Sequence, residues 1–123
     1  MIIPLPGVNR QTKMEEISLN LHIHSKYSDG SGTHEDIARA ACKSGLDAVI
    51  VTDHNVLVSE KEGYYTFDGR SVLLLVGEEI HNQAKFPQKN HLLVFGTNRE
   101  LAPFAPDPQN LINLVKNSGG SCF

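Results

Sequence analysis

The stretch that decides the fold begins with Ile17-Ser-Leu-Asn-Leu-His-Ile-His24 and ends, after a polar loop and a helical segment, with Asp47-Ala-Val-Ile-Val-Thr52. Apolar and polar side chains alternate in the first segment, which predicts a strand with histidines on one face. The second segment is mostly apolar, as in strands buried inside parallel sheets. Together they predict two parallel strands joined by a helix.

The ends of the intervening helix can be read from its capping residues. Thr33 can cap the first turn, and Asp36 stands at the third helical position, as in a capping box. Gly45 is a plausible residue to follow the last turn. Between these ends, apolar or small side chains recur at helical spacing, at Ile37, Ala40, Ala41 and Ser44.

The second half of the chain predicts further strands and a second helix. Segments 64–67 and 71–80 flank Asp68-Gly69, which is typical of a hairpin turn. A strand over 91–96 and a helix over 108–117 follow. The last residues, from Gly119, resemble the start of another strand, so we expect a chain truncated at its C-terminus. The fold class is α/β, with a leader or connecting loop at 1–16 and one partial domain at 17–123.

Composition limits the possible partners and compartment. The formal net charge of the 123 residues is −3, and no run of Lys or Arg could follow a phosphate backbone, which argues against nucleic-acid binding unless the chain is part of a polymerase. Two cysteines without a CxxC motif favour a reducing, cytoplasmic setting. No stretch approaches the roughly 20 apolar residues of a membrane span.

The first candidate metal ligands lie at the end of the first strand. His22 and His24 are two positions apart, so both rings can reach one ion from the same face. Asp29 follows in the loop, and Gly30 lets the backbone turn back. Taken alone, an H-x-H pair is more often two polar residues on a half-buried strand, and Asp29 more often starts a turn.

The next strands repeat this pattern. The second ends in Asp53-His54 and the third in Glu78-Glu79, of which alternation allows only one to face the same ligand set. A carboxylate between two cations could bridge them. His91 opens the fourth strand, a less diagnostic place. Each residue alone could be a turn or surface residue, but three successive strand ends with ligand types predict a shared metal site. His34 and His81 are interpreted as lying outside it.

These motifs resemble those of a known family. Residues 20–30 (NLHIHSKYSDG), Thr52-Asp-His54, Gly77-Glu-Glu79 and His91 with the following LLVFG are similar, in order, to the first motifs of the polymerase and histidinol phosphatase (PHP) superfamily. The resemblance implies the N-terminal part of a distorted (β/α)₇ barrel. It also implies that His22 and His24 bind one metal, Asp29 and His54 another, that Glu79 bridges, and that His91 binds a further ion.

The resemblance also implies an activity. Two or three divalent ions (Zn, Mn, Fe or Mg) would activate a hydroxide that attacks a small phosphomonoester, a nucleotide or sugar-like phosphate. We assign Asp53 to orienting a ligand histidine. The later Ala-His-Pro and Asp-x-His motifs of the family are absent, so this fragment could be inactive. Two alternatives stay open: an amidohydrolase-like metal hydrolase, and a non-catalytic accessory PHP domain.

Overall fold

The computed structural model describes residues 14–123, so most of the predicted leader lies outside the described residues. The elements, in chain order, are β1 (Leu19–Ile23), α1 (His34–Lys43), β2 (Ala48–His54), η1 (Ser59–Lys61), β3 (Gly63–Phe67), β4 (Arg70–Ile80), β5 (Leu92–Phe95), η2 (Ala102–Phe104), α2 (Pro108–Asn117) and β6 (Ser121–Cys122). The α/β class predicted from the sequence is confirmed.

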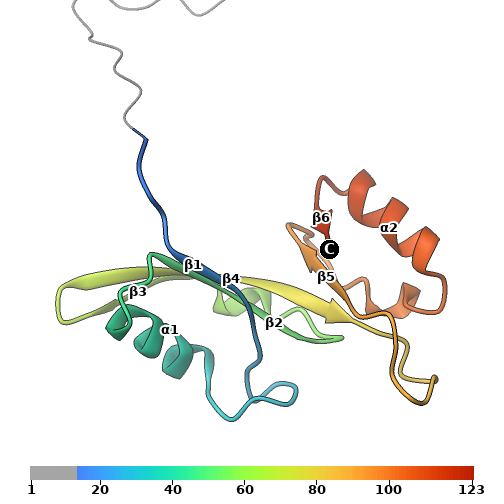
Figure 1. The fold of residues 1–123 in the computed structure, drawn as a ribbon, viewed down its shortest axis with the longest axis horizontal. Coiled ribbons are helices and arrows are strands. Elements are labelled where there is room, and N and C mark those ends of the chain that lie inside the picture. Colours follow the sequence, from blue (N-terminus) through green and yellow to red (C-terminus); the bar gives the residue numbers. More distant parts are fainter. Residues whose placement is uncertain (1–13) are drawn as a thin grey trace, which may run out of the picture.

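One curled, mixed sheet contains all the described strands, in the order β1-β2-β4-β5-β6 (Figure 1). The first three strands of this order, β1, β2 and β4, are parallel, and α1 connects β1 to β2 as predicted. The long strand β4 carries β2 on one edge. Its other edge is shared by two antiparallel strands, since β3 pairs with Arg70–Leu74 and β5 pairs with Gly77–Ile80.

This topology brings four chain segments to one edge of the sheet. Because β1, β2 and β4 are parallel, their carboxyl ends meet there, and they carry His24, His54 and Glu79. Strand β5 runs the other way, so its start lies at the same edge, with Leu92 opposite Ile80. The antiparallel pairing therefore brings His91, just before β5, to the edge where the other three segments end.

Helix α1 begins with the predicted capping box, in which the backbone of Asp36 donates to the Thr33 hydroxyl and that of Thr33 donates to the Asp36 carboxylate. The predicted apolar stripe was partly wrong, because Ala40 and Ser44 are exposed. The buried side chains are those of His34, Ile37, Ala38, Ala41 and Cys42. All of these except His34 pack on the side chains that β2 and β4 present to one face, which are Val49, Val51, Val72, Leu74 and Val76.

The C-terminal half builds a second core. The predicted hairpin joins β3 to β4 through Asp68 and Gly69, whose φ angles of 51° and 78° suit a tight antiparallel turn. Figure 1 shows α2 beside β5 and β6, at the other end of the sheet from α1. The cluster there consists of Ile80, Val94, Leu101, Leu111 and Val115. Within residues 14–123, neither α-helix is long and apolar enough to cross a bilayer.

Strand β1 differs from the prediction in its start and its burial. It begins at Leu19 rather than Ile17, and its pairing with β2 is irregular between Asn20 and Ile23. The apolar side chains of this strand remain partly open, since Leu19 is 44% and Leu21 48% exposed. The described residues therefore leave this edge strand only partly covered.

Candidate metal centre

The six side chains that the sequence proposed as metal ligands lie together at the carboxyl edge of the sheet. They form three overlapping groups in which every ligand atom lies within 4.8 Å of the others. The groups are His22, His24 and Glu79; His24, Asp29 and His54; and His54, Glu79 and His91. The topology of the sheet, rather than sequence proximity, brings them together.

Glu79 lies at the centre of this arrangement. Its Oε2 atom is 2.9 Å from Nε2 of His22 and 2.8 Å from Nε2 of His24. The other carboxylate oxygen, Oε1, lies 3.0 Å from Nδ1 of His91. Nδ1 of His54 approaches Oε2 at 3.8 Å. One carboxylate thus faces four imidazoles, with its two oxygens turned to different rings, as a bridging ligand requires.

The loop after β1 supplies the second group. Asp29 Oδ1 lies 2.8 Å from Nδ1 of His24, and its Oδ2 lies 3.3 Å from Nε2 of His54. The Asp29 side chain is 66% exposed, whereas those of His24 and His54 are about four-fifths buried, at 18% and 19% exposure. The carboxylate of Asp29 therefore closes the site from the solvent side.

The distances fit a shared ion. Two ligand atoms about 2.1 Å from one cation and at right angles to each other are about 3.0 Å apart. Nε2 of His22 and Nε2 of His24 are 2.9 Å apart, and both lie about as far from Glu79 Oε2. Nδ1 of His54 is buried without a hydrogen-bond partner among the described residues. A divalent cation would satisfy such converging lone pairs, so the residues present fit a metal centre.

The pKa shifts of the Glu79 and Asp29 carboxylates agree with a metal centre. Burial raises the pKa of Glu79, but the hydrogen bonds with His22 and His91 and the nearby imidazole charges together lower it by more. The pKa of Glu79 therefore lies below its ordinary value. For Asp29, desolvation raises the pKa, but the charges of His24 and His54 and the hydrogen bonds of the carboxylate together lower it by more, so its pKa also lies below the ordinary value. Both carboxylates are therefore in the ionised form that binds cations.

Asp53 has a different environment from the one expected. Its carboxylate accepts hydrogen bonds from the backbone of Ser25, from the Ser25 hydroxyl and from the Ser28 hydroxyl, each at 2.7 Å. The imidazole that lies near the Asp53 carboxylate is that of His34, whose Nε2 is 3.9 Å from Oδ2. His34 is not one of the proposed metal ligands. Asp53 thus holds the loop that carries Asp29, and its effect on the metal centre runs through that loop.

Gly30 allows the same loop to fold tightly. A Cβ atom at this position would overlap the carbonyl oxygen of His24. The backbone amide of Gly30 donates to the Ser25 carbonyl at 2.9 Å. The turn predicted after the first strand is therefore present, and it returns Asp29 to the ring of His24.

Alternation separates the two glutamates as the sequence analysis required. Glu78 points away from the metal centre, where Oε2 accepts a hydrogen bond from the backbone of Leu101 at 3.0 Å. It is fully buried, and its Oε1 atom has no partner among the described residues. Burial raises the pKa of Glu78 to about 7, despite that hydrogen bond.

His34 and His81 are both buried, at 2% and 5% exposure. His34 lies under the Tyr27 ring, and none of the three ligand groups includes it, in agreement with the sequence interpretation. His81 differs: its ring centroid is 5.0 Å from that of His54 and 4.8 Å from that of His91. Burial and the two neighbouring rings lower its pKa. None of the three ligand groups includes His81, in agreement with the sequence interpretation. Its ring nevertheless packs against two proposed ligands, a contact indicated by its place two residues after Glu79 on the same face.

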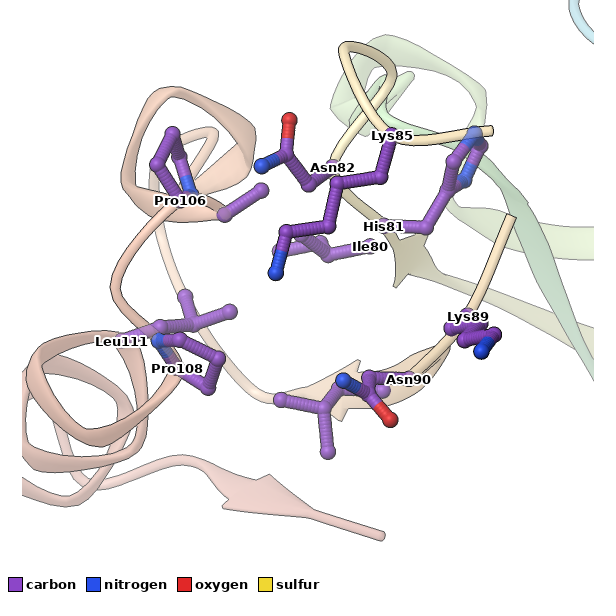
Figure 2. A pocket seen from close by; sticks show the side chains of 11 residues that line it. Ile80, His81, Asn82, Lys85, Lys89, Asn90, Pro106, Pro108 and Leu111 are labelled. Atoms are coloured by element: carbon purple, nitrogen blue, oxygen red, sulfur yellow. The ribbon is translucent and has the colours of Figure 1, made fainter. Parts of the chain in front are cut away.

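Among the described residues, His81 lines three cavities, one of which, of about 370 Å³, lies between Asn55 and the 100–106 segment. The other two differ widely in size. One, of about 530 Å³, is open to solvent and lined by Asp29, His54 and His81 together with Tyr27, Ser28, Gln83 and Gln88. The other lies between the 80–92 segment and α2, and Figure 2 shows Lys85 reaching across it. Its volume of about 20 Å³ holds little more than one water molecule. Of the three, the 530 Å³ cavity is the one that has room for an organic substrate and is also lined by proposed metal ligands, Asp29 and His54.

The motifs and the geometry agree with the comparison to known families. The family model described as PHP domain matches residues 20–120. The chain belongs to the PHP domain family. This PHP domain forms the N-terminal part of a PHP-type barrel.

Among solved structures, the PHP domain is similar to a protein of Bifidobacterium adolescentis to which metal-dependent phosphoesterase activity is provisionally assigned. The two share 23% identity with a TM-score of 0.49, over 85% of this chain and 34% of the other. The chain thus spans about a third of that protein's length. No curated protein matches it significantly.

Proposed function

We propose that this PHP domain is part of a metal-dependent phosphoesterase that hydrolyses small phosphomonoesters, such as a nucleotide or a sugar-like phosphate. The observation that carries the proposal is the position of Glu79, whose two carboxylate oxygens face ring nitrogens of His22, His24 and His91 at 3.0 Å or less. Family membership supports metal-dependent hydrolysis, and the open cavity beside Asp29 and His54 offers room for the substrate.

In this proposal His22, His24 and Glu79 would hold one cation, and Asp29 and His54 would hold a second. His91 would bind a further ion, which would make two or three ions of Zn, Mn, Fe or Mg. Bound divalent cations lower the pKa of water from about 16 toward neutrality and neutralise phosphoryl oxygens. The three ligand groups overlap at His24, His54 and Glu79, so ions held by them would be close neighbours.

The charge of the cavity supports this role for the ions. Neither Lys nor Arg is among the residues that line the 530 Å³ cavity, and Asp29 contributes a negative charge there. An anionic phosphate would be repelled by the metal-free site, whereas two or three cations reverse the local field. Substrate binding, and not only the chemical step, should therefore depend on metal.

The test is phosphate release from p-nitrophenyl phosphate, with Mn²⁺ or Zn²⁺, by the purified full-length protein that carries this PHP domain. We expect turnover that disappears when His22 and His24 are both changed to Ala, and that survives in the exposed-site control Glu60→Gln. Turnover of amide substrates without phosphate release would favour the amidohydrolase-like alternative. Metal binding without turnover of either class would favour an accessory domain.

A further inference from the structure

The tautomer of the His81 ring can be inferred from two contacts with Asn55. The backbone N–H of His81 donates to Oδ1 of Asn55 at 3.0 Å. A backbone amide can only donate, so the amide atom that it meets must be the oxygen. The other amide atom, Nδ2, is then a donor, and it lies 3.4 Å from Nδ1 of His81.

A donor facing Nδ1 determines where the ring carries its proton. Nδ1 must accept, so the neutral imidazole has its hydrogen on Nε2. Asn55 can make both contacts because it adopts a left-handed backbone conformation, with a φ of 54° at the end of β2. The amide therefore holds the ring at two points and selects the Nε2–H form.

The ring of His81 is part of the wall of the substrate cavity. Figure 2 shows the ring turned away from the narrow cavity that holds Lys85. His81 lines the 530 Å³ cavity together with Asp29 and His54. Its Nε2 has no hydrogen-bond partner within residues 14–123, and unlike the ring nitrogens of His34 it is not closed off from solvent. The ring thus offers an unpaired N–H donor at the wall of the cavity where a substrate would lie.

The other residues of this cavity indicate what the donor meets. Away from the proposed ligands Asp29 and His54, its lining consists of uncharged hydrogen-bonding side chains, those of Tyr27, Ser28, Gln83 and Gln88. Amides and hydroxyls suit hydroxyl groups, and a second anionic group would find no cationic side chain among them. The lining favours a leaving group with several hydroxyls.

We propose that His81, held by Asn55, donates a hydrogen bond from Nε2 to a hydroxyl oxygen on the leaving group of the substrate. This role rests on the proposed phosphoesterase function and makes His81 a specificity residue for phosphomonoesters of polyhydroxylated alcohols. His81 is not a metal ligand in this assignment, because Nε2 carries hydrogen and Nδ1 is occupied by Asn55.

The test compares two probes, D-ribose 5-phosphate, whose leaving group has several hydroxyls, and p-nitrophenyl phosphate, whose leaving group has none. His81→Phe keeps a ring but removes the donor, so KM for ribose 5-phosphate should rise about 3- to 10-fold, the range for loss of one neutral hydrogen bond. KM for p-nitrophenyl phosphate should rise by less than KM for ribose 5-phosphate, and the metal content should stay unchanged. His81→Gln, whose amide can place a donor near the Nε2 position, should recover most of the loss.

Two results would overturn the assignment. If His81→Phe changed KM for both probes equally, His81 would not contact a hydroxyl of the leaving group. If this variant lost metal, His81 would be a metal ligand. The tautomer is checked separately by ¹⁵N NMR of the imidazole in the metal-free protein, where hydrogen on Nδ1 would also contradict it. If the wild-type protein hydrolyses neither probe, the phosphoesterase proposal fails, while the NMR result still decides whether His81 presents a donor.

Discussion

Nε2 of His22 lies 2.9 Å from Oε2 of Glu79, a residue 57 positions later in the chain. The two are not on adjacent strands, since β2 lies between β1 and β4. Their side chains meet because the sheet curls and because both project from the same face near the carboxyl edge. The site therefore depends on how the sheet folds as well as on which residue types the strands carry.

Changing Glu79 to Gln keeps the shape of the side chain but removes its negative charge. We expect loss of at least one bound ion by elemental analysis. Phosphate release should fall by at least about 100-fold, beyond the roughly 10- to 100-fold typical of residues that only support a ligand. Glu78→Gln is the matched control, because Glu78 points to the opposite face of the same strand. Equal metal loss in both variants would refute the bridging role.

Asp53→Ala should destabilise the protein by about 2–4 kcal/mol, because three donors that now meet a carboxylate with 1% exposure would lose their acceptor. Urea unfolding measures the change. Asp47→Ala is the comparison, since its carboxylate also accepts from a serine backbone and hydroxyl but is exposed, and its cost should be smaller. A larger loss of unfolding free energy in Asp47→Ala than in Asp53→Ala would contradict the proposed role of Asp53 in holding the loop.

Glu78 makes stability depend on pH. Its pKa is raised by burial from 4.5 to about 7 in the folded protein, so the folded state binds the proton more tightly than the unfolded state does. Stability should therefore fall as pH rises from about 4.5 to about 7 and then level off. Urea midpoints between these limits should decline for the wild type and vary less in Glu78→Gln. An unaltered decline in the variant would assign the pH dependence to other groups.

The ring of His34 is buried with both nitrogens unpaired among the described residues, a costly arrangement. Replacing it with Leu should leave metal content unchanged and should keep or raise the thermal midpoint, because the apolar side chain removes two unsatisfied polar atoms. Elemental analysis and a thermal melt provide both readouts. A loss of metal in His34→Leu would place this histidine in the metal centre after all.

Much of the fold could be predicted because its signals are local. The capping box at Thr33 and the turn at Asp68-Gly69 need only neighbouring residues, and both are present. Side-chain alternation correctly separated Glu79 from Glu78. The pairing of β5 with β4 could not be read locally, since it depends on which edge of β4 remains free.

The contacts of Asp53 and His81 could not be predicted from the sequence. The donors to Asp53 come from Ser25 and Ser28, in a loop whose path is set by tertiary packing and by the close approach at Gly30. His81 follows Glu79 on the same face, but its contact with Asn55 requires the parallel pairing of β2 and β4. Residue types predicted the candidate ligands, whereas the supporting contacts required coordinates.

The central claim is that one carboxylate joins cations held by histidines from separate strands. An anomalous difference map from crystals of the protein soaked in Zn²⁺ tests it most directly. The account predicts a peak about 2.1 Å from Nε2 of His22, Nε2 of His24 and Oε2 of Glu79, with a second peak between Asp29 and His54. Fully occupied zinc sites elsewhere on the protein, with no density among these side chains, would contradict it.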